Sequence, residues 1–204
     1  MARSRALAVI TSTPAEALEL LKDGNARFVA GTSQSEPYGP RVRDFAGAQN
    51  PFAAVLGCSD SRVPIETIFD QAPGNVFVVR VAGNFVNDDN LGSLEFAVEI
   101  LKVRLIVVLG HGRCGALTAA LSLLREGIRQ HGHIQDIVDA VVPAVKATRS
   151  MEGDWLHNAI VQNVALNVKA ISARSKIVSE PVATGRLQVI GATYDVTNGL
   201  VTFA

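Results

Sequence analysis

Cysteine is scarce in this sequence, because Cys58 and Cys114 are the only two among 204 residues. A disulfide framework is not expected in a chain of this size whose N-terminus shows no secretory signal core. A net charge is also absent, since 19 Lys and Arg residues balance 19 Asp and Glu residues. Without a basic excess, no overall field favours nucleic acid or an anionic membrane as a partner.

Long apolar runs are missing as well. Uncharged stretches such as residues 114–124 are shorter than the roughly 18 apolar residues that a membrane span needs. We therefore expect a cytoplasmic protein with no membrane partner. The shares of hydrophobic residues, 48%, and of charged residues, 19%, exclude a disordered chain.

The length and pattern predict a single domain over residues 1–204, of which about 1–45 form an N-terminal helical arm and a connector. The arm begins at a capping box made by Thr13 and Glu16, with Pro14 at the first helical position, and its helical spacing runs to Gly31. The connector that follows is rich in Gly, Pro, Ser and Gln.

Five short apolar segments are typical of buried strands, at 52–57, 76–79, 105–109, 187–190 and 200–203. Helical spacing is found at 91–102, 116–126, 134–148 and 155–173, and Pro143 is expected to kink the third of these helices. Strands too hydrophobic to face water, separated by helices, predict an α/β fold with a mainly parallel β-sheet flanked by helices on both faces. Asn198-Gly199 before the last segment indicates a closing hairpin.

Three potential metal ligands follow two of these strands. Cys58 comes directly after the first strand, whereas His111 and Cys114 follow the third. The carboxyl ends of parallel strands meet at one edge of the sheet, where ligands bind. Two thiolates and one imidazole are good zinc ligands, and three protein ligands leave the fourth position open. Each residue alone is more typical of a buried core, but three at one edge favour zinc.

Asp60 and Arg62 extend this group. In an extended segment alternate side chains share a face, so Cys58, Asp60 and Arg62 would point together. One interpretation is an ordinary surface ion pair. The functional interpretation is that Asp60 accepts a hydrogen bond from a zinc-bound hydroxide, while Arg62 holds the carboxylate away from the metal.

A competing motif overlaps the second ligand segment. Residues 110–115 match G-x-G-x-x-G between a strand and a helix, which is the dinucleotide-binding pattern. The acidic residue expected about 20 positions later should end a strand, yet Asp136 and Asp139 lie in a predicted helix. A nucleotide-binding module is therefore the weaker alternative.

The sequence resembles the β-class carbonic anhydrases. The resemblance is carried by CSDSR at 58–62 and HGRC at 111–114, and it extends through the residues between them. It implies reversible hydration of carbon dioxide to bicarbonate by a carbonate dehydratase, a zinc-dependent lyase with one Zn²⁺ per chain. It also implies a homodimer or a dimer of dimers, with the N-terminal arm packed on a partner subunit.

The same resemblance implies roles for individual residues. The zinc ligands fall on Cys58, His111 and Cys114, and a catalytic Asp–Arg pair falls on Asp60 and Arg62. The substrate-binding residues implied are Gln49, Phe77, Phe96 and Gly115, where Phe96 replaces the usual Tyr and Gly115 contributes its backbone N–H.

Some members of that family have an additional bicarbonate pocket built from Trp, Arg and Tyr. Arg80 and Tyr194 are candidates for two of its residues, but the Trp position is Val55 in this chain. We therefore expect an open site, with water rather than Asp60 on zinc. A zinc hydrolase of carbonyl sulfide or carbon disulfide and a non-catalytic zinc module also stay open as functions of the same residues.

Overall fold

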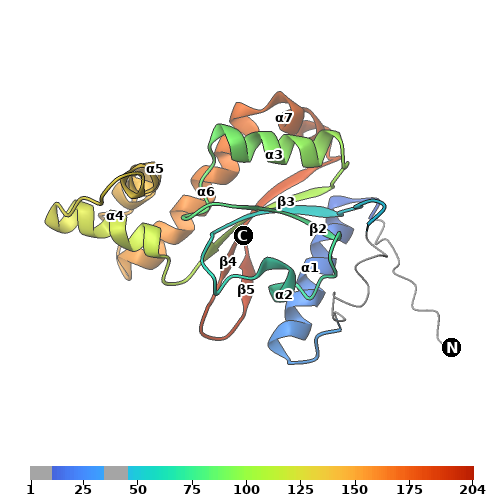
Figure 1. Cartoon of the computed structure of the whole chain (residues 1–204), viewed down its shortest axis with the longest axis horizontal. Coiled ribbons are helices and arrows are strands. Elements are labelled where there is room, and N and C mark those ends of the chain that lie inside the picture. Colours follow the sequence, from blue (N-terminus) through green and yellow to red (C-terminus); the bar gives the residue numbers. More distant parts are fainter. Residues whose placement is uncertain (1–10, 35–45) are drawn as a thin grey trace.

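A five-stranded sheet forms the centre of the computed structural model, which describes residues 11–34 and 46–204 (Figure 1). Its strands are β1 (Ala53–Gly57), β2 (Val76–Arg80), β3 (Leu105–His111), β4 (Gln188–Tyr194) and β5 (Val201–Phe203), in the order β2-β1-β3-β4-β5. The first four are parallel, and β5 runs antiparallel to β4. The predicted α/β fold and the closing hairpin are thus confirmed.

Helices cover both faces of this sheet, as Figure 1 shows. The helices are α1 (Pro14–Val29), α2 (Ile65–Ile68), α3 (Asp88–Glu99), α4 (Gly115–Glu126), α5 (Ile134–Ala147), α6 (Trp155–Arg174) and α7 (Lys176–Ala183). One face packs against α1 and α2, and the other against α3, α6 and α7. Helices α4 and α5 form a third apolar cluster with α6 beyond the carboxyl edge of the sheet.

The helix that contains Pro143, α5, is continuous from Ile134 to Ala147. Two short helices, α2 and α7, were not predicted from the sequence. Helix α2 is only four residues long, too short for a periodic pattern. Helix α7 follows α6 after a single residue, Ser175, whose side chain accepts a hydrogen bond from Val178 N. That cap starts a new helix where the pattern alone showed only the end of α6.

Helix α1 is fastened to its own sheet. The predicted capping box is present, with Glu16 N–H donating to Thr13 Oγ1 over 3.2 Å. Asn25, 3% exposed, donates to the carbonyls of Ile68 and Gly199 over 3.1 and 2.9 Å. The helix therefore shares the core of the sheet. Residues 35–45 of the connector lie outside the described residues, and contact of the arm with a partner subunit stays a prediction.

Candidate metal centre

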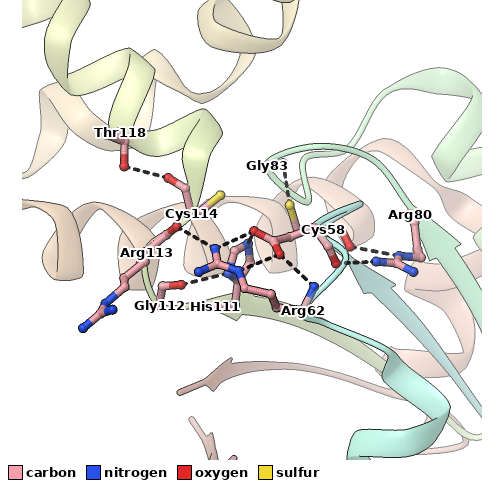
Figure 2. Close-up of polar contacts among 10 residues, drawn as sticks. Cys58, Arg62, Arg80, Gly83, His111, Gly112, Arg113, Cys114 and Thr118 are labelled. Atoms are coloured by element: carbon pink, nitrogen blue, oxygen red, sulfur yellow. Dashed lines mark hydrogen bonds and ion pairs between the residues drawn. The ribbon is translucent and has the colours of Figure 1, made fainter. Parts of the chain in front are cut away.

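The three predicted metal ligands converge at the carboxyl edge of the sheet. Because β1 and β3 are adjacent and Gly57 pairs with Leu109, Cys58 emerges beside the end of β3. One ligand atom from each of Cys58, His111 and Cys114 lies within 4.8 Å of the other two. All three side chains are buried, with exposed fractions of 4%, 0% and 1% in that order. Figure 2 shows both sulfur atoms close to the imidazole.

The orientation of His111 suits a metal ligand. Its Nδ1 lies 2.9 Å from the carbonyl oxygen of Gly112, so this nitrogen carries the proton and donates it. The lone pair is then on Nε2, which is buried and has no hydrogen-bond partner among the described residues. Only one other buried side-chain nitrogen or oxygen atom of the described chain, Asn84 Nδ2, has no such partner. A buried lone pair without a donor is costly unless a cation satisfies it.

The two thiols complete the donor set. A hydrogen bond from the Cys114 thiol lowers the pKa of Cys58, and a bond from the Gly83 amide acts in the same direction against the effect of burial. Donation to Cys58, together with burial, raises the pKa of Cys114. Two sulfur ligands and one neutral imidazole fit Zn²⁺ and leave a fourth position for an exchangeable ligand.

Asp60 lies beside this cluster and is held by Arg62. The guanidinium donates from Nε to Oδ1 over 3.0 Å and from Nη2 to Oδ2 over 2.7 Å, and the Arg62 backbone N–H also donates to Oδ1 over 2.9 Å. These bonds hold the pKa of Asp60 well below its usual range, against the opposing effect of burial. Oδ2 lies 4.0 Å from His111 Nε2, beyond hydrogen-bonding distance. The carboxylate is thus ionised next to the cluster and anchored away from it.

Arg62 also joins the two segments that supply the ligands. Its Nη2 donates to the carbonyl of Arg113 over 3.3 Å. Arg113 has a positive φ of 57°, a conformation that non-glycine residues seldom adopt and that turns its carbonyl here. One guanidinium therefore connects the loop after β1 with the turn between His111 and Cys114.

Arg80, the last residue of the neighbouring strand β2, donates two hydrogen bonds to the loop that carries Cys58 and Asp60. Its Nε donates to the carbonyl of Cys58 over 3.0 Å, and its Nη2 donates to that of Asp60 over 2.7 Å. Arg80 and Tyr194 are also the candidates for an additional bicarbonate pocket. In the structure β1 and β3 lie between the strands that carry them, and Val55 is fully buried in the core.

The predicted substrate residues divide into two groups. Gly115 is the first residue of α4, next to Cys114, whereas Gln49 is exposed in the segment before β1, at the opposite end of that strand from Cys58. Phe77 pairs with Ala54, four residues before Cys58, which places it about 13 Å back along the sheet. Phe96 stacks on Phe77 with ring centroids 6.3 Å apart and is 46% exposed. Within one chain the two aromatic residues therefore meet each other rather than the cysteine–histidine cluster.

Gly83 is a functional contact that was not predicted from the sequence. Its backbone N–H donates to Cys58 Sγ over 3.3 Å. A glycine in the turn shortly after a strand is a signal for an unusual backbone conformation, and Gly83 has a φ of +83°. The sequence alone does not say which atom that turn would approach.

Among the described residues, no helix is both long enough and apolar enough to cross a membrane. Residues 53–201 match the carbonic anhydrase family. A carbonic anhydrase of Mycolicibacterium smegmatis is 43% identical over 191 residues, which cover 93% of each chain.

Solved structures similar to this chain are also carbonic anhydrases. A β-carbonic anhydrase of Aspergillus fumigatus superposes with a TM-score of 0.72 at 27% identity, covering 93% of this chain and 89% of that one. A structure from a study of two tetrameric β-carbonic anhydrases of Sordaria macrospora superposes with a TM-score of 0.71 at 25% identity, covering 92% and 96%. The cysteine–histidine cluster thus lies in a chain that belongs to the β-carbonic anhydrase family.

Proposed function

We propose that this chain catalyses the reversible hydration of carbon dioxide to bicarbonate and a proton, with one zinc ion per chain held by Cys58, His111 and Cys114. The observation that carries the proposal is the buried, unpartnered Nε2 of His111 between two cysteine sulfurs, next to a carboxylate held by arginine. Zinc bound there would supply the Lewis acidity that makes water nucleophilic near neutral pH.

Asp60 orients the attacking group. Since Arg62 keeps its pKa low, the carboxylate is ionised throughout the neutral range and acts only as a hydrogen-bond acceptor. When the attacking oxygen donates its hydrogen to the Asp60 carboxylate, a lone pair of that oxygen points toward the substrate carbon. Arg62 contributes indirectly, because its two parallel hydrogen bonds prevent the carboxylate from turning toward the ligand cluster.

Neutral hydrogen-bond donors are suited to the substrate oxygens. The N–H of Gly115 lies at the start of α4, where helix amides favour negative charge. Gln49 precedes the amino end of β1, whereas Cys58 follows its carboxyl end, so the Gln49 side-chain amide would donate to developing bicarbonate in the pocket of a second copy of the chain. The remaining requirement is an apolar wall for carbon dioxide, for which the sequence offers Phe77 and Phe96.

In an oligomer, Phe77 and Phe96 of one chain would form the apolar wall of the carbon dioxide pocket of another chain. Phe96 is exposed on α3 and lies away from its own metal ligands, so it would face the pocket of a partner subunit. The Sordaria macrospora relatives are described as tetrameric. We therefore propose a homo-oligomer built from dimers, in which each pocket combines ligands from one chain with aromatic side chains from another.

Stopped-flow measurement of carbon dioxide hydration over about pH 6.5 to 9, with zinc quantified on the same sample, tests the proposal. We expect turnover with about one zinc ion per chain. Cys58→Ala should lose both zinc and turnover, whereas Val145→Ala, which truncates a buried residue of the same apolar cluster, should keep both. Full zinc without turnover would contradict the proposal, and release of sulfide from carbonyl sulfide would then identify the alternative hydrolase.

A further inference from the structure

A buried turn after β2 contacts the ligand Cys58. The N–H of Gly83 donates to Cys58 Sγ over 3.3 Å, and Figure 2 shows this bond on the side of the sulfur away from Arg62. An amide that donates to a ligating sulfur limits the directions in which the sulfur can bind a metal and tunes its electron density. The position of the Gly83 backbone therefore matters for the metal centre.

Backbone hydrogen bonds hold the part of the turn around Val81, whose N–H donates to the Gly57 carbonyl over 3.1 Å and whose carbonyl accepts from Asn84 N–H over 2.9 Å. The Gly83 φ of +83° disfavours any L side chain, and an added Cβ would lie 2.9 Å from Val141 Cγ1 and 3.1 Å from Ala116 Cβ. The residue must be glycine, so no side chain of its own can anchor the turn. The Gly83 carbonyl takes no part in these backbone bonds, and its partner comes from another element.

Helix α6 supplies that anchor through Asn163. Its Nδ2 donates to the carbonyl oxygen of Gly83 over 2.9 Å in a buried contact, and the residue is only 3% exposed. Burying an amide is costly unless its hydrogen bonds are made, and the bond to Gly83 satisfies the donor side.

Asn167, one helical turn later, fixes the orientation of the Asn163 amide. Asn167 Nδ2 donates to Asn163 Oδ1 over 3.2 Å, so the oxygen of Asn163 is occupied and its nitrogen faces Gly83. The Oδ1 of Asn167 accepts from the N–H of Val86 over 2.7 Å, which ties down the end of the same loop. Two adjacent turns of α6 thus hold the loop that contains Gly83.

We propose that Asn163 is a positioning residue for the metal centre, which holds the Gly83 turn so that its N–H bonds to Cys58 Sγ. The inference rests on the proposed metal site. Loss of the Asn163 amide would loosen the donor without removing any ligand. The metal would then leave faster, and the sulfur would bind it in a less defined geometry.

The first test uses Asn163→Leu, which keeps the approximate volume and removes the hydrogen bonds. Transfer of zinc to a chromogenic chelator from the folded holoprotein should be about tenfold faster or more. In the cobalt-substituted protein, the sulfur-to-metal absorption bands should shift or weaken. These two readouts report on the metal and its sulfur ligands rather than on turnover.

Asn25→Leu is a matched control, because Asn25 is also 3% exposed and also donates to backbone carbonyls. It lies on α1, against the opposite face of the sheet from α6. Both variants should be less stable, but only Asn163→Leu should change zinc transfer and the cobalt spectrum. An unchanged Asn163→Leu, or the same change in both variants, overturns the inference.

A measurement on the unmodified chain keeps the inference testable if Asn163→Leu does not fold. With ¹¹³Cd in the site, a scalar coupling between cadmium and the Gly83 amide proton is expected through the N–H···S bond, and its absence would refute the proposal. A parent chain that binds no metal would instead defeat the proposed site itself. A zinc-loaded, active parent with an indistinguishable Asn163→Leu variant would defeat only the role of Asn163.

Discussion

At the scale of single residues, the candidate site depends on how Arg62 holds Asp60. An isolated carboxylate two residues after Cys58 is itself a possible metal ligand. The two side-chain hydrogen bonds from Arg62, at 3.0 and 2.7 Å, occupy both carboxylate oxygens. In the proposed site, Asp60 would therefore accept a hydrogen bond beside the metal and leave the fourth ligand position available.

Replacement of Asp60 by Asn tests this division of roles. Asp60→Asn removes the negative charge and offers a donor where an acceptor is needed, so turnover should fall about tenfold or more. Zinc content should stay near one ion per chain, since no ligand is changed. Stopped-flow hydration and metal analysis on the same sample measure both.

Asp88→Asn is the control for the loss of an arginine-bound carboxylate. Asp88 Oδ1 accepts from Arg174 Nη2 over 2.5 Å, and its side chain is 95% exposed on α3. Its replacement should leave turnover unchanged. Full turnover of Asp60→Asn would remove the assigned role.

At the scale of elements, helix α6 lies directly on the sheet where two strands carry glycine. A Cβ at Gly110 of β3 would lie 2.7 Å from Val164 Cγ2, and a Cβ at Gly191 of β4 would lie 2.6 Å from Val164 Cγ1. The close approach brings Asn163 of α6 within reach of Gly83. The same close approach explains why residue 110, the first glycine of the segment 110–115, is a glycine: the helix packs where a side chain would lie.

Gly191→Ala tests this packing. The added methyl group has no room, so the free energy of unfolding should fall by about 1–3 kcal/mol, as measured by urea denaturation. In a Val164→Ala background the same substitution should cost less, because the methyl groups that it meets are gone.

Gly92→Ala provides the comparison, since Gly92 lies inside α3 and a Cβ added there would have no atom within 4 Å. That substitution should be neutral or stabilise the chain by up to about 1 kcal/mol. Equal effects of Gly191→Ala in both Val164 backgrounds would contradict the proposed contact.

At the scale of the whole molecule, one surface of α3 exposes apolar side chains that the fold does not cover. Phe96 is 46% exposed and Ile100, four residues later, is 60% exposed, so the two lie on one side of the helix. Phe77 stacks against Phe96 from the sheet. Burial against a second copy would remove this surface from water and bring the aromatic residues to a neighbouring pocket.

Ile100→Asp is expected to weaken this association, because a charge would be buried at the contact. Sedimentation velocity should show a smaller species than the parent at the same concentration. Ile134→Asp, at a residue that is 56% exposed on α5, should leave the sedimentation coefficient unchanged. If Ile100→Asp sediments like the parent, α3 is not part of the interface.

Much of this protein was predictable from local patterns. Buried parallel strands are continuous apolar runs, so the five strands and the longer helices could be recognised from their residues. The rule that parallel strands end at one edge was enough to group Cys58, His111 and Cys114. Both regularities involve residues close in sequence or a general property of sheets, so no knowledge of side-chain packing was needed.

The tertiary structure decided the contacts that join distant segments. Asn163 and Gly83 are 80 residues apart, and Asn25 bonds to a carbonyl 174 residues away. No periodic pattern encodes such pairs, because they depend on which helix covers which face and how closely. The sequence by itself thus determined which three side chains could hold a metal and the chemistry that they would permit. Long-range packing decided how Cys58 is supported and that Phe77 and Phe96 lie away from the cysteine–histidine cluster of their own chain.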